Sequence, residues 1–417
     1  MKKISIFLLC IFLQSLPILA EKDEIPNLIK LLGSNDYRIN AKARQNLKNF
    51  GSLAVPALIQ VLNDTKSNDN LRINSIITLE NIALDAKEAV PILIETTEDD
   101  NFLIRKASVF ALGSIDPTNE RVISALINAL HDRNESVSTY ALLSLQNCGS
   151  KAVPALVRLL KHTDFNIKVK ASIALHNNLQ YQDQVVPTLI KALSYNNNEL
   201  RSLSGVALAE IGPSIVPELS KALNQDNDII PLGVILTLSF MYKENKPIKS
   251  AIPILIRLLN VKDKKVIVQS ADLLKQIGPE AKPAAVALIG VLGHDDEEIR
   301  FAGMDALIEI GPSSIPELIL AVDDGNVNKR IYAISVLAEF DNLPVLTIPP
   351  LINALNDTNH MIRIAAIYAL GNVCDPNDDV RVALIKAIGD KNEEVSTLAK
   401  KTIRKIRAKE DLPVQCD

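Results

Sequence analysis

The side chains that most often hold metals or move protons are few in this chain of 417 residues, and they are scattered along it. Its five histidines are His131, His162, His176, His294 and His360. None of them stands three or four residues from another, the spacing at which one helix face presents two imidazoles to a metal ion. We therefore expect neither a metal site nor any other cofactor.

Carboxylates cluster mainly where a helix needs them. Acidic pairs stand at predicted helix starts, where a carboxylate caps free N–H groups and favours the helix dipole. These pairs are Asp99-Asp100, Asp295-Asp296 and Asp323-Asp324. His131-Asp132 and His294-Asp295 fall in predicted turns, where aspartate is expected in any case. Because the chain also lacks a Gly-x-Ser-x-Gly motif, a phosphate-binding loop and a dinucleotide-binding pattern, we expect no catalytic residues and no enzyme activity.

The elements that must position any functional side chain come from one unit that recurs about twelve times. Segments such as 55–62, VPALIQVL, and 186–193, VPTLIKAL, align on a proline, and leucine follows two residues later in every unit. The aligned prolines are Pro26, Pro56, Pro91, Pro154, Pro187, Pro217, Pro253, Pro316 and Pro349, with Ser124, Val286 and Val382 at the same position in the other units. Apolar residues at steps of three and four predict a helix that begins near the proline.

A second helical pattern lies between these segments. It has an aliphatic residue before a basic one and a small residue three positions after it, as in 299–307, IRFAGMDAL. The small residue lets a neighbouring helix come close. Since no single helix pair could bury its own apolar faces, neighbouring pairs must stack. We predict an all-α fold, an α-solenoid (superhelix) of about twelve helix pairs over residues 22–409, with residues 410–417 as a C-terminal tail.

These paired helices resemble HEAT repeats, and the short unit resembles the HEAT-like repeats of phycobilisome lyases. The motif that carries the resemblance is D-x-x-x-x-[IV]-R-x-x-A-x-x-A-L-x-x-[IL]-G. In such repeats an aspartate in the turn and the arginine of the following helix form stacked ladders. The resemblance implies such pairs in three units, Asp99 with Arg105, Asp324 with Arg330 and Asp357 with Arg363. Pro231 and Ile267 replace the arginine in the middle repeats, so the ladder should break there.

A run of basic residues occupies the fourth position after the proline in four consecutive units. These residues are Arg158, Lys191, Lys221 and Arg257. The position points away from the apolar face of its helix, toward the concave side of such solenoids. The four cations could form a basic ridge that binds an acidic protein segment or a polyanion. Exposed helix positions are often basic in any protein, so the residues could also be an ordinary solvated surface.

The segment 229–242, IIPLGVILTLSFMY, lacks the polar face that the second helix of a unit normally has. It is therefore either a helix buried on both sides or an exposed apolar patch for binding.

The first twenty residues predict a signal peptide. Lys2 and Lys3 precede an apolar run, and Ala20 precedes an abrupt polar switch. An uncleaved anchor is the alternative, but the run is short for a membrane span. Cleavage would leave 43 basic and 49 acidic side chains, a balance unlike that of a nucleic-acid-binding protein. We expect an exported chain, periplasmic or secreted, without a membrane span after cleavage.

Three cysteines remain after cleavage, an odd number that cannot form a framework of disulfides. Cys374 ends one predicted helix, while Cys416 lies in the tail beyond the next. A disulfide between these two is possible in an oxidising compartment if the tail folds back. Cys148 fits a buried position at a helix end.

The sequence as a whole favours an exported scaffold, not an enzyme, that binds a protein partner along its concave surface. Two alternatives remain open. The resemblance implies a role like that of a bilin lyase, or one associated with such a lyase, and the basic ridge would suit a protein that binds a polyanion or the envelope surface. Self-association through the end repeats is also open.

Overall fold

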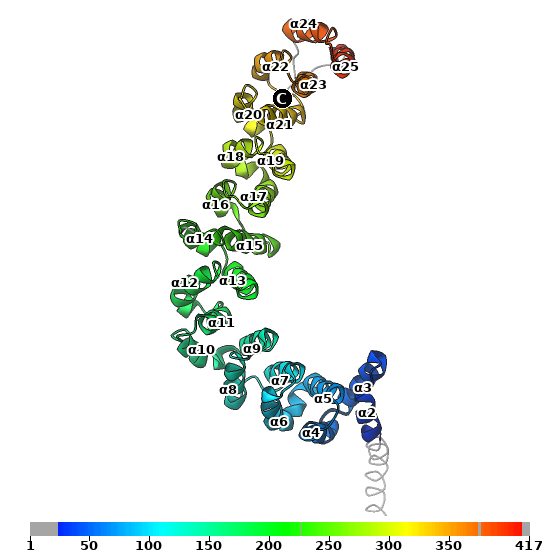
Figure 1. Ribbon diagram of the computed structural model, residues 1–417, viewed down its shortest axis with the longest axis vertical. Coiled ribbons are helices and arrows are strands. Elements are labelled where there is room, and N and C mark those ends of the chain that lie inside the picture. The colour runs from blue at the N-terminus through cyan, green and yellow to red at the C-terminus, as the bar shows by residue number, and fades with distance from the viewer. Residues whose placement is uncertain (1–23, 226, 374–376, 411–417) are drawn as a thin grey trace, which may run out of the picture. The chain divides into compact units, whose positions relative to one another are not determined.

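A computed structural model describes residues 24–225, 227–373 and 377–410 (Figure 1). The predicted leader, Cys374 and Cys416 lie outside these residues. Within them every regular element is a helix, apart from one isolated bridge between Leu343 and Val373. The prediction of an all-α solenoid is therefore confirmed.

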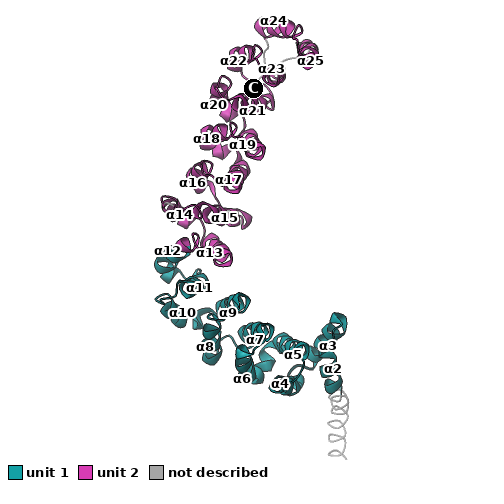
Figure 2. Ribbon diagram, in the orientation of Figure 1, with its two compact units in different colours: residues 1–189 teal, residues 190–417 magenta. Residues whose placement is uncertain are grey.

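The chain separates into two compact units, Met1–Leu189 and Ile190–Asp417 (Figure 2). The division falls inside helix α12 (Gln182–Ala192). Each unit is a row of helix pairs in which successive pairs stack on one another, as the ribbon diagram shows.

Each pair has a leading helix, which carries the aligned proline position, and a following helix. The leading helices are α2 (Ile25–Leu32), α4 (Val55–Asn63), α6 (Val90–Glu95), α8 (Glu120–Ala129), α10 (Val153–Leu159), α12, α14 (Val216–Ala222), α16 (Ile252–Leu258), α18 (Ala285–Val291), α20 (Ile315–Ala321), α22 (Ile348–Ala354) and α24 (Asp378–Ala387).

The following helices are longer. They are α3 (Tyr37–Phe50), α5 (Asp69–Ile82), α7 (Phe102–Ile115), α9 (Glu135–Asn147), α11 (Phe165–Leu175), α13 (Asn198–Ile211), α15 (Ile230–Lys243), α17 (Lys264–Ile277), α19 (Glu297–Ile310), α21 (Val327–Ala338), α23 (His360–Leu370) and α25 (Glu393–Glu410).

Short 3-10 helices occupy most of the connections. They are η1 (Gly51–Ala54), η2 (Ala83–Ala89), η3 (Thr96–Glu98), η4 (Gly149–Lys151), η5 (Leu179–Tyr181), η6 (Pro213–Ile215), η7 (Lys249–Ala251), η8 (Gly278–Ala284), η9 (Gly311–Ser314) and η10 (Val345–Thr347).

The helix ends follow the local sequence. Most leading helices have their proline in the first turn, where no intrahelical N–H bond is lost. Following helices commonly begin at an asparagine or aspartate whose side chain accepts a backbone N–H, as Asn101 does from Leu103. Gly212 and Gly311 end α13 and α19 at φ values of 98° and 81°, a conformation that glycine adopts without strain. Helix α12 differs, since it begins before its proline and carries Pro187 in its interior.

The core is a row of aliphatic side chains between the stacked helices. The leucine two residues after the proline position is buried in all twelve units. The apolar helix α15 is also mostly buried, and Leu232 and Leu236 on its outer side are half-buried. This part of the chain therefore packs into the stack and offers no broad apolar patch.

Close helix packing depends on small side chains in the following helices. Gly113 of α7 faces Ser144 of α9, and a Cβ atom on Gly113 would lie 2.5 Å from the Ser144 Cβ. The Ser144 hydroxyl donates a hydrogen bond to the Val109 carbonyl at 3.1 Å. Two following helices thus meet through a glycine and a serine, with no room for a methyl group between them.

A matched pair of glycine substitutions tests this packing. Gly113→Ala should lower the free energy of unfolding by about 1–2 kcal/mol, because overpacking at Ser144 outweighs the better helix propensity of alanine. Gly290→Ala, in α18, should raise it by about 0.5–1 kcal/mol, because a Cβ there meets nothing within 4 Å. Urea unfolding followed by circular dichroism measures both, and a stabilised Gly113→Ala protein would contradict the close approach.

Candidate protein-binding face

The leading helices expose one edge throughout the described chain. We call this edge the leading face, and define it as the proline position and the fourth residue after it in each unit. The fourth-position residues are Lys30, Gln60, Glu95, Asn128, Arg158, Lys191, Lys221, Arg257, Gly290, Leu320, Asn353 and Lys386. All of them are exposed, and so are the residues at the proline position. The face is the surface that the helical period assigns to the side opposite the buried leucines.

The predicted basic ridge falls partly in each compact unit. Arg158 lies in the first unit, and Lys191, Lys221 and Arg257 lie in the second. The Lys221 ammonium is 2.7 Å from a carboxylate oxygen of Glu218 on the same helix. Lys221 therefore presents a charge that is already balanced within the protein.

Arg257 is engaged by the neighbouring unit. Its guanidinium donates to the Ser220 carbonyl at 2.9 Å and to the Asn224 side-chain oxygen at 2.8 Å. It thus links α16 to the end of α14. These contacts give two of the four residues a structural role, and binding through the ridge stays a prediction.

The C-terminal part of the leading face carries exposed aliphatic residues, which the sequence analysis did not predict. Leu320 is 80% exposed and Val286 is 70% exposed, although nothing in their own helices requires an apolar side chain there. Val382 is 67% exposed and Ile385 of the same helix is 54% exposed. The signal was present in the sequence, since Val286 and Val382 stand where most units have proline and Leu320 stands where most have a polar residue.

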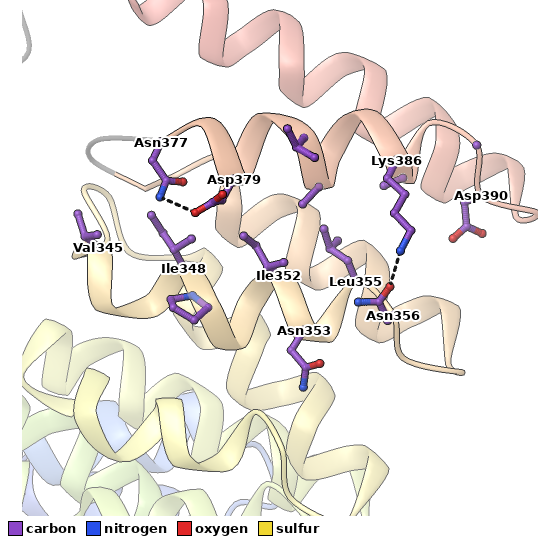
Figure 3. A pocket seen from close by; sticks show the side chains of 15 residues that line it. Val345, Ile348, Ile352, Asn353, Leu355, Asn356, Asn377, Asp379, Lys386 and Asp390 are labelled. Atoms are coloured by element: carbon purple, nitrogen blue, oxygen red, sulfur yellow. Dashed lines mark hydrogen bonds between the residues drawn. The ribbon is translucent and has the colours of Figure 1, made fainter.

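A groove of about 890 Å³ lies between α22 and α24 at this apolar end (Figure 3). One wall is formed by Ile348 and Ile352 of α22 and by Leu355 at the C-cap of that helix. The opposite wall is a stripe of α24, formed by Asp379, Val382, Ala383 and Lys386.

Polar side chains stand at both ends of the groove. Asp379 accepts a hydrogen bond from the Asn377 side chain at 3.3 Å. At the other end, Lys386 donates to the Asn356 side-chain oxygen at 3.3 Å (Figure 3). Asp390 also lines the groove, but its carboxylate is paired with Arg363 at 2.8 Å.

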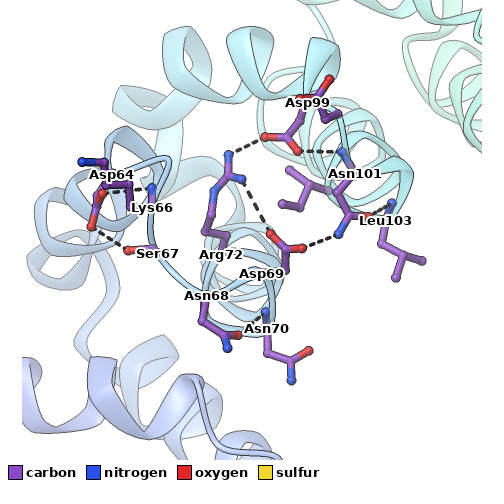
Figure 4. Close-up of polar contacts among 12 residues, drawn as sticks. Asp64, Lys66, Ser67, Asn68, Asp69, Asn70, Arg72, Asp99, Asn101 and Leu103 are labelled. Atoms are coloured by element: carbon purple, nitrogen blue, oxygen red, sulfur yellow. Dashed lines mark hydrogen bonds and ion pairs between the residues drawn. The ribbon is translucent and has the colours of Figure 1, made fainter.

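Ion pairs between successive units hold the turns in line. Figure 4 shows the first of them, in which Arg72 of α5 reaches Asp99 at 2.5 Å and lies 3.9 Å from Asp69. Asp99 also accepts the Asn101 backbone N–H at 2.9 Å, so one carboxylate caps its own turn and binds the preceding unit. The Arg72 side chain is only 5% exposed, so this pair is shielded from water.

The predicted Asp–Arg pairs meet in a different way from the one the resemblance implied. Arg105 does contact its own turn, but through the carbonyl oxygen of Asp99 at 2.8 Å. The carboxylate that it binds belongs to Asp132 of the next unit, with two hydrogen bonds of 2.7 and 2.8 Å.

The same arrangement recurs near the C-terminus. Arg330 donates to the Asp324 carbonyl and binds the Asp357 carboxylate, and Arg363 donates to the Asp357 carbonyl and binds the carboxylate of Asp390. The ladder therefore joins each arginine to an aspartate 27 residues further along. Asp132 and Asp390 were not predicted as partners, because the prediction paired each arginine with the aspartate of its own unit.

The ladder is absent where its two members are replaced together. Ser138 stands at the arginine position of one unit, and His162 stands at the aspartate position of the next. Ile267 and His294 are a second such combination. Both histidines keep the capping role of the aspartate, because Nδ1 of His162 accepts the Asp164 N–H and Nδ1 of His294 accepts the Asp296 N–H. These contacts give the turn histidines a structural function.

The ladder carboxylates are held in their charged form. Arg363 and the Asn392 backbone N–H lower the pKa of Asp390, against the opposing effect of burial. Burial alone would raise the pKa of Asp132, but hydrogen bonds from Arg105 and the Asn134 backbone N–H lower it overall.

Cys148 is buried, as predicted, and burial raises the pKa of its thiol to about 11. The described residues contain no group of three or more His, Cys, Asp or Glu side chains placed to hold a metal ion. Within the same part of the chain, no helix combines the length and the apolar composition that crossing a membrane requires.

Comparison with known proteins identifies the family. HEAT repeats match residues 25–113, 55–146, 123–209, 315–395 and 348–414, which together cover more than half of the chain. The chain belongs to the HEAT repeat family. The match does not distinguish a subclass of HEAT repeats, and no curated protein matches the chain.

Solved structures with the same fold include two of Kap121p. The karyopherin Kap121p bound to the SUMO protease Ulp1p is 14% identical, with a TM-score of 0.56, and the similarity covers 93% of this chain and 45% of that one. Kap121p bound to Nup53p is 13% identical, with the same TM-score and coverage. This HEAT-repeat chain spans less than half the length of those karyopherin chains, and at such identity the likeness shows the fold alone.

The buried ladder should contribute more stability than an exposed pair between units. Asp132→Asn should lower the free energy of unfolding by about 2 kcal/mol or more, because the Arg105 side chain, 6% exposed, would lose its only carboxylate partner among the described residues. Glu280→Gln removes the exposed Lys249–Glu280 pair and should cost less than about 1 kcal/mol. Equal losses in urea unfolding would show that the ladder has no special role.

The lowered pKa values of Asp132 and Asp390 predict a loss of stability in acid. A carboxylate with a pKa below its unfolded value of about 3.9 stabilises the fold above that pH, and this contribution disappears as pH falls through the folded pKa. Unfolding free energies measured between pH 5 and pH 2 should therefore fall less steeply for Asp132→Asn than for the unchanged protein. An unaltered slope for Asp132→Asn would contradict the lowered pKa of Asp132.

Proposed function

We propose that this HEAT-repeat protein is a scaffold without catalytic activity that binds a protein partner along its leading face. The observation that carries the proposal is the exposed apolar section of that face, with Leu320 at 80% and Val286 at 70% exposure. Exposed aliphatic side chains on successive leading helices are costly to leave in water, and they are typical of surfaces that another protein covers.

The comparisons support this proposal in general terms. Both Kap121p structures are complexes in which a chain of this fold is bound to another protein. Stacked helix pairs offer a long surface with the same side-chain positions repeated, which suits a partner that lies across several units. The partner of this chain is a protein whose binding segment brings apolar side chains to Val286 and Leu320.

We further propose that the protein acts outside the cytoplasm, in the periplasm or as a secreted protein. The support is the leader-like sequence of residues 1–20, with Lys2 and Lys3 before the apolar run and Ala20 at the polar switch. The finer resemblance to phycobilisome-lyase repeats would instead place the protein beside cytoplasmic antenna complexes. No contact among the described residues favours that alternative.

A second candidate function is binding of a polyanion or the envelope surface through Arg158, Lys191, Lys221 and Arg257. The exposure of all four side chains favours it. The ion pair of Lys221 weakens it, because that charge is already balanced within the chain. The hydrogen bonds of Arg257 to Ser220 and Asn224 hold its guanidinium against α14 but leave its charge unbalanced. Binding of this kind would fall steeply with added salt, whereas binding through aliphatic side chains would not.

Two leucines with almost the same exposure test the proposal. Residues 21–417 would be immobilised and used to capture proteins from the envelope fraction of the source organism. Leu320→Asp should reduce capture of the specific partner at least tenfold, because a carboxylate would be buried without a partner at the apolar contact. Leu179→Asp alters a side chain of 79% exposure in η5, off the leading face, and should leave capture unchanged.

The alternatives predict other outcomes in the same experiment. If charge reversal of the four ridge residues abolishes capture, and if moderate salt does the same, the basic ridge is the binding surface. Equal capture by the Leu320→Asp and Leu179→Asp variants would refute the apolar leading face.

A further inference from the structure

The groove between α22 and α24 has two walls of different chemistry. Ile348 and Ile352 of α22 and Leu355 at its C-cap are four and three residues apart, so they form one aliphatic stripe along that helix. Asp379, Val382 and Lys386 of α24 follow the same spacing and form a stripe that is charged at both ends. Figure 3 shows the aliphatic side chains of α22 directed toward α24 across the groove.

The two charges of the α24 wall are spaced like side chains of an extended peptide. Asp379 and Lys386 are seven residues apart, or about 10 Å along a helix that rises 1.5 Å per residue. A polyproline II segment rises about 3.1 Å per residue and has three residues per turn, so its residues i and i+3 lie on one side, about 9 Å apart. The spacing of the charges thus matches one turn of such a segment.

These charges are available to a ligand. Among the described residues, Asp379 has no ion pair, and its one hydrogen bond comes from the neutral Asn377 amide. Lys386 likewise binds only the neutral Asn356 amide. By contrast, Asp390 is neutralised by Arg363, and Asp378 is paired with Arg381. One carboxylate and one ammonium therefore stand at opposite ends of an apolar groove.

We propose that this groove binds an extended, polyproline-II-like peptide segment of the protein partner. The segment carries a basic residue and, three positions away, an acidic one, with an aliphatic residue between them. The basic side chain pairs with Asp379 and the acidic one with Lys386, while the aliphatic side chain packs on the half-buried Ile352 and Leu355. This inference rests on the proposed function and adds the kind of sequence that the scaffold recognises.

The test uses a fluorescein-labelled synthetic peptide that contains Arg-Pro-Leu-Glu between Gly-Ser flanks, with binding followed by fluorescence polarisation. The full chain should bind it saturably. Val382→Asp should weaken binding at least tenfold, because a charge would enter the middle of the groove. Leu84→Asp is the matched control, since it changes an aliphatic residue of similar exposure, 63%, in η2, which is neither on the leading face nor in the groove, and it should bind like the unchanged protein.

Charge specificity gives a second readout that a simple folding defect would not reproduce. Lys386→Glu should weaken binding of the Arg-Pro-Leu-Glu peptide and strengthen binding of an Arg-Pro-Leu-Arg peptide, each several-fold. Lys391→Glu changes the net charge equally at an exposed position that does not line the groove, and should alter neither affinity markedly. Equal effects of the two lysine variants would show that net charge alone governs binding and would overturn the proposal.

Failure of this inference can be told apart from failure of the proposed function. If the peptide does not bind, or if Val382→Asp binds it normally, the groove is not a peptide site. Loss of partner capture in Leu320→Asp would still stand in that case and would support the leading face. If Leu320→Asp leaves capture unchanged while Val382→Asp and Lys386→Glu alter peptide binding as expected, the groove binds its peptide segment and the rest of the leading face does not take part.

Discussion

The structure depends on the fact that no helix pair can bury its own core. The leucine of each leading helix reaches zero or near-zero exposure only because the neighbouring units cover it. Helix pairs must therefore approach closely, which explains Gly113 against Ser144 and Gly371 against Thr402, where an added Cβ atom would lie 3.0 Å from the Thr402 methyl group. What is left in contact with water is the edge of each leading helix, and this edge is the candidate binding surface.

Polar contacts between successive helix pairs fix the orientation of one pair relative to the next, in addition to the apolar packing. Arg105, Arg330 and Arg363 each donate to a carbonyl of their own turn and bind a carboxylate in the next unit, so each fixes the angle between two turns as well as their distance. The pairs Arg72–Asp99 and Arg105–Asp132 lie in the first compact unit, and Arg330–Asp357 and Arg363–Asp390 lie in the second. Between Ser138 and Ile267 the stack relies on aliphatic packing and on scattered contacts such as Arg257 with Ser220.

Periodicity alone predicted the fold, because a proline, a leucine and a small residue each recur at positions that only a helix pair explains. The exposure of the fourth position followed from the same period. The partner of each ladder arginine could not be predicted from this period, because contacts between units depend on how the units stack. Sequence spacing within one unit carries no such information. The groove between α22 and α24 was also missed, since it comes from the separation of two helices whose own sequences look ordinary. Val286 and Leu320 can be recognised in the sequence as aliphatic residues at exposed positions, but the prediction of a binding surface used only the charged residues.

The 27-residue offset of the ladder makes its ion pairs sensitive to the length of the chain that connects two units. Arg300 and Asp324 are present at the two ladder positions but stand only 24 residues apart. Arg300 donates to the His294 and Asp295 carbonyls of its own turn, and its guanidinium lies 5.2 Å from the centre of the Tyr332 ring in the next unit. Three residues of connecting chain thus distinguish an arginine that is paired with a carboxylate of the next unit from one that lies against an aromatic ring there.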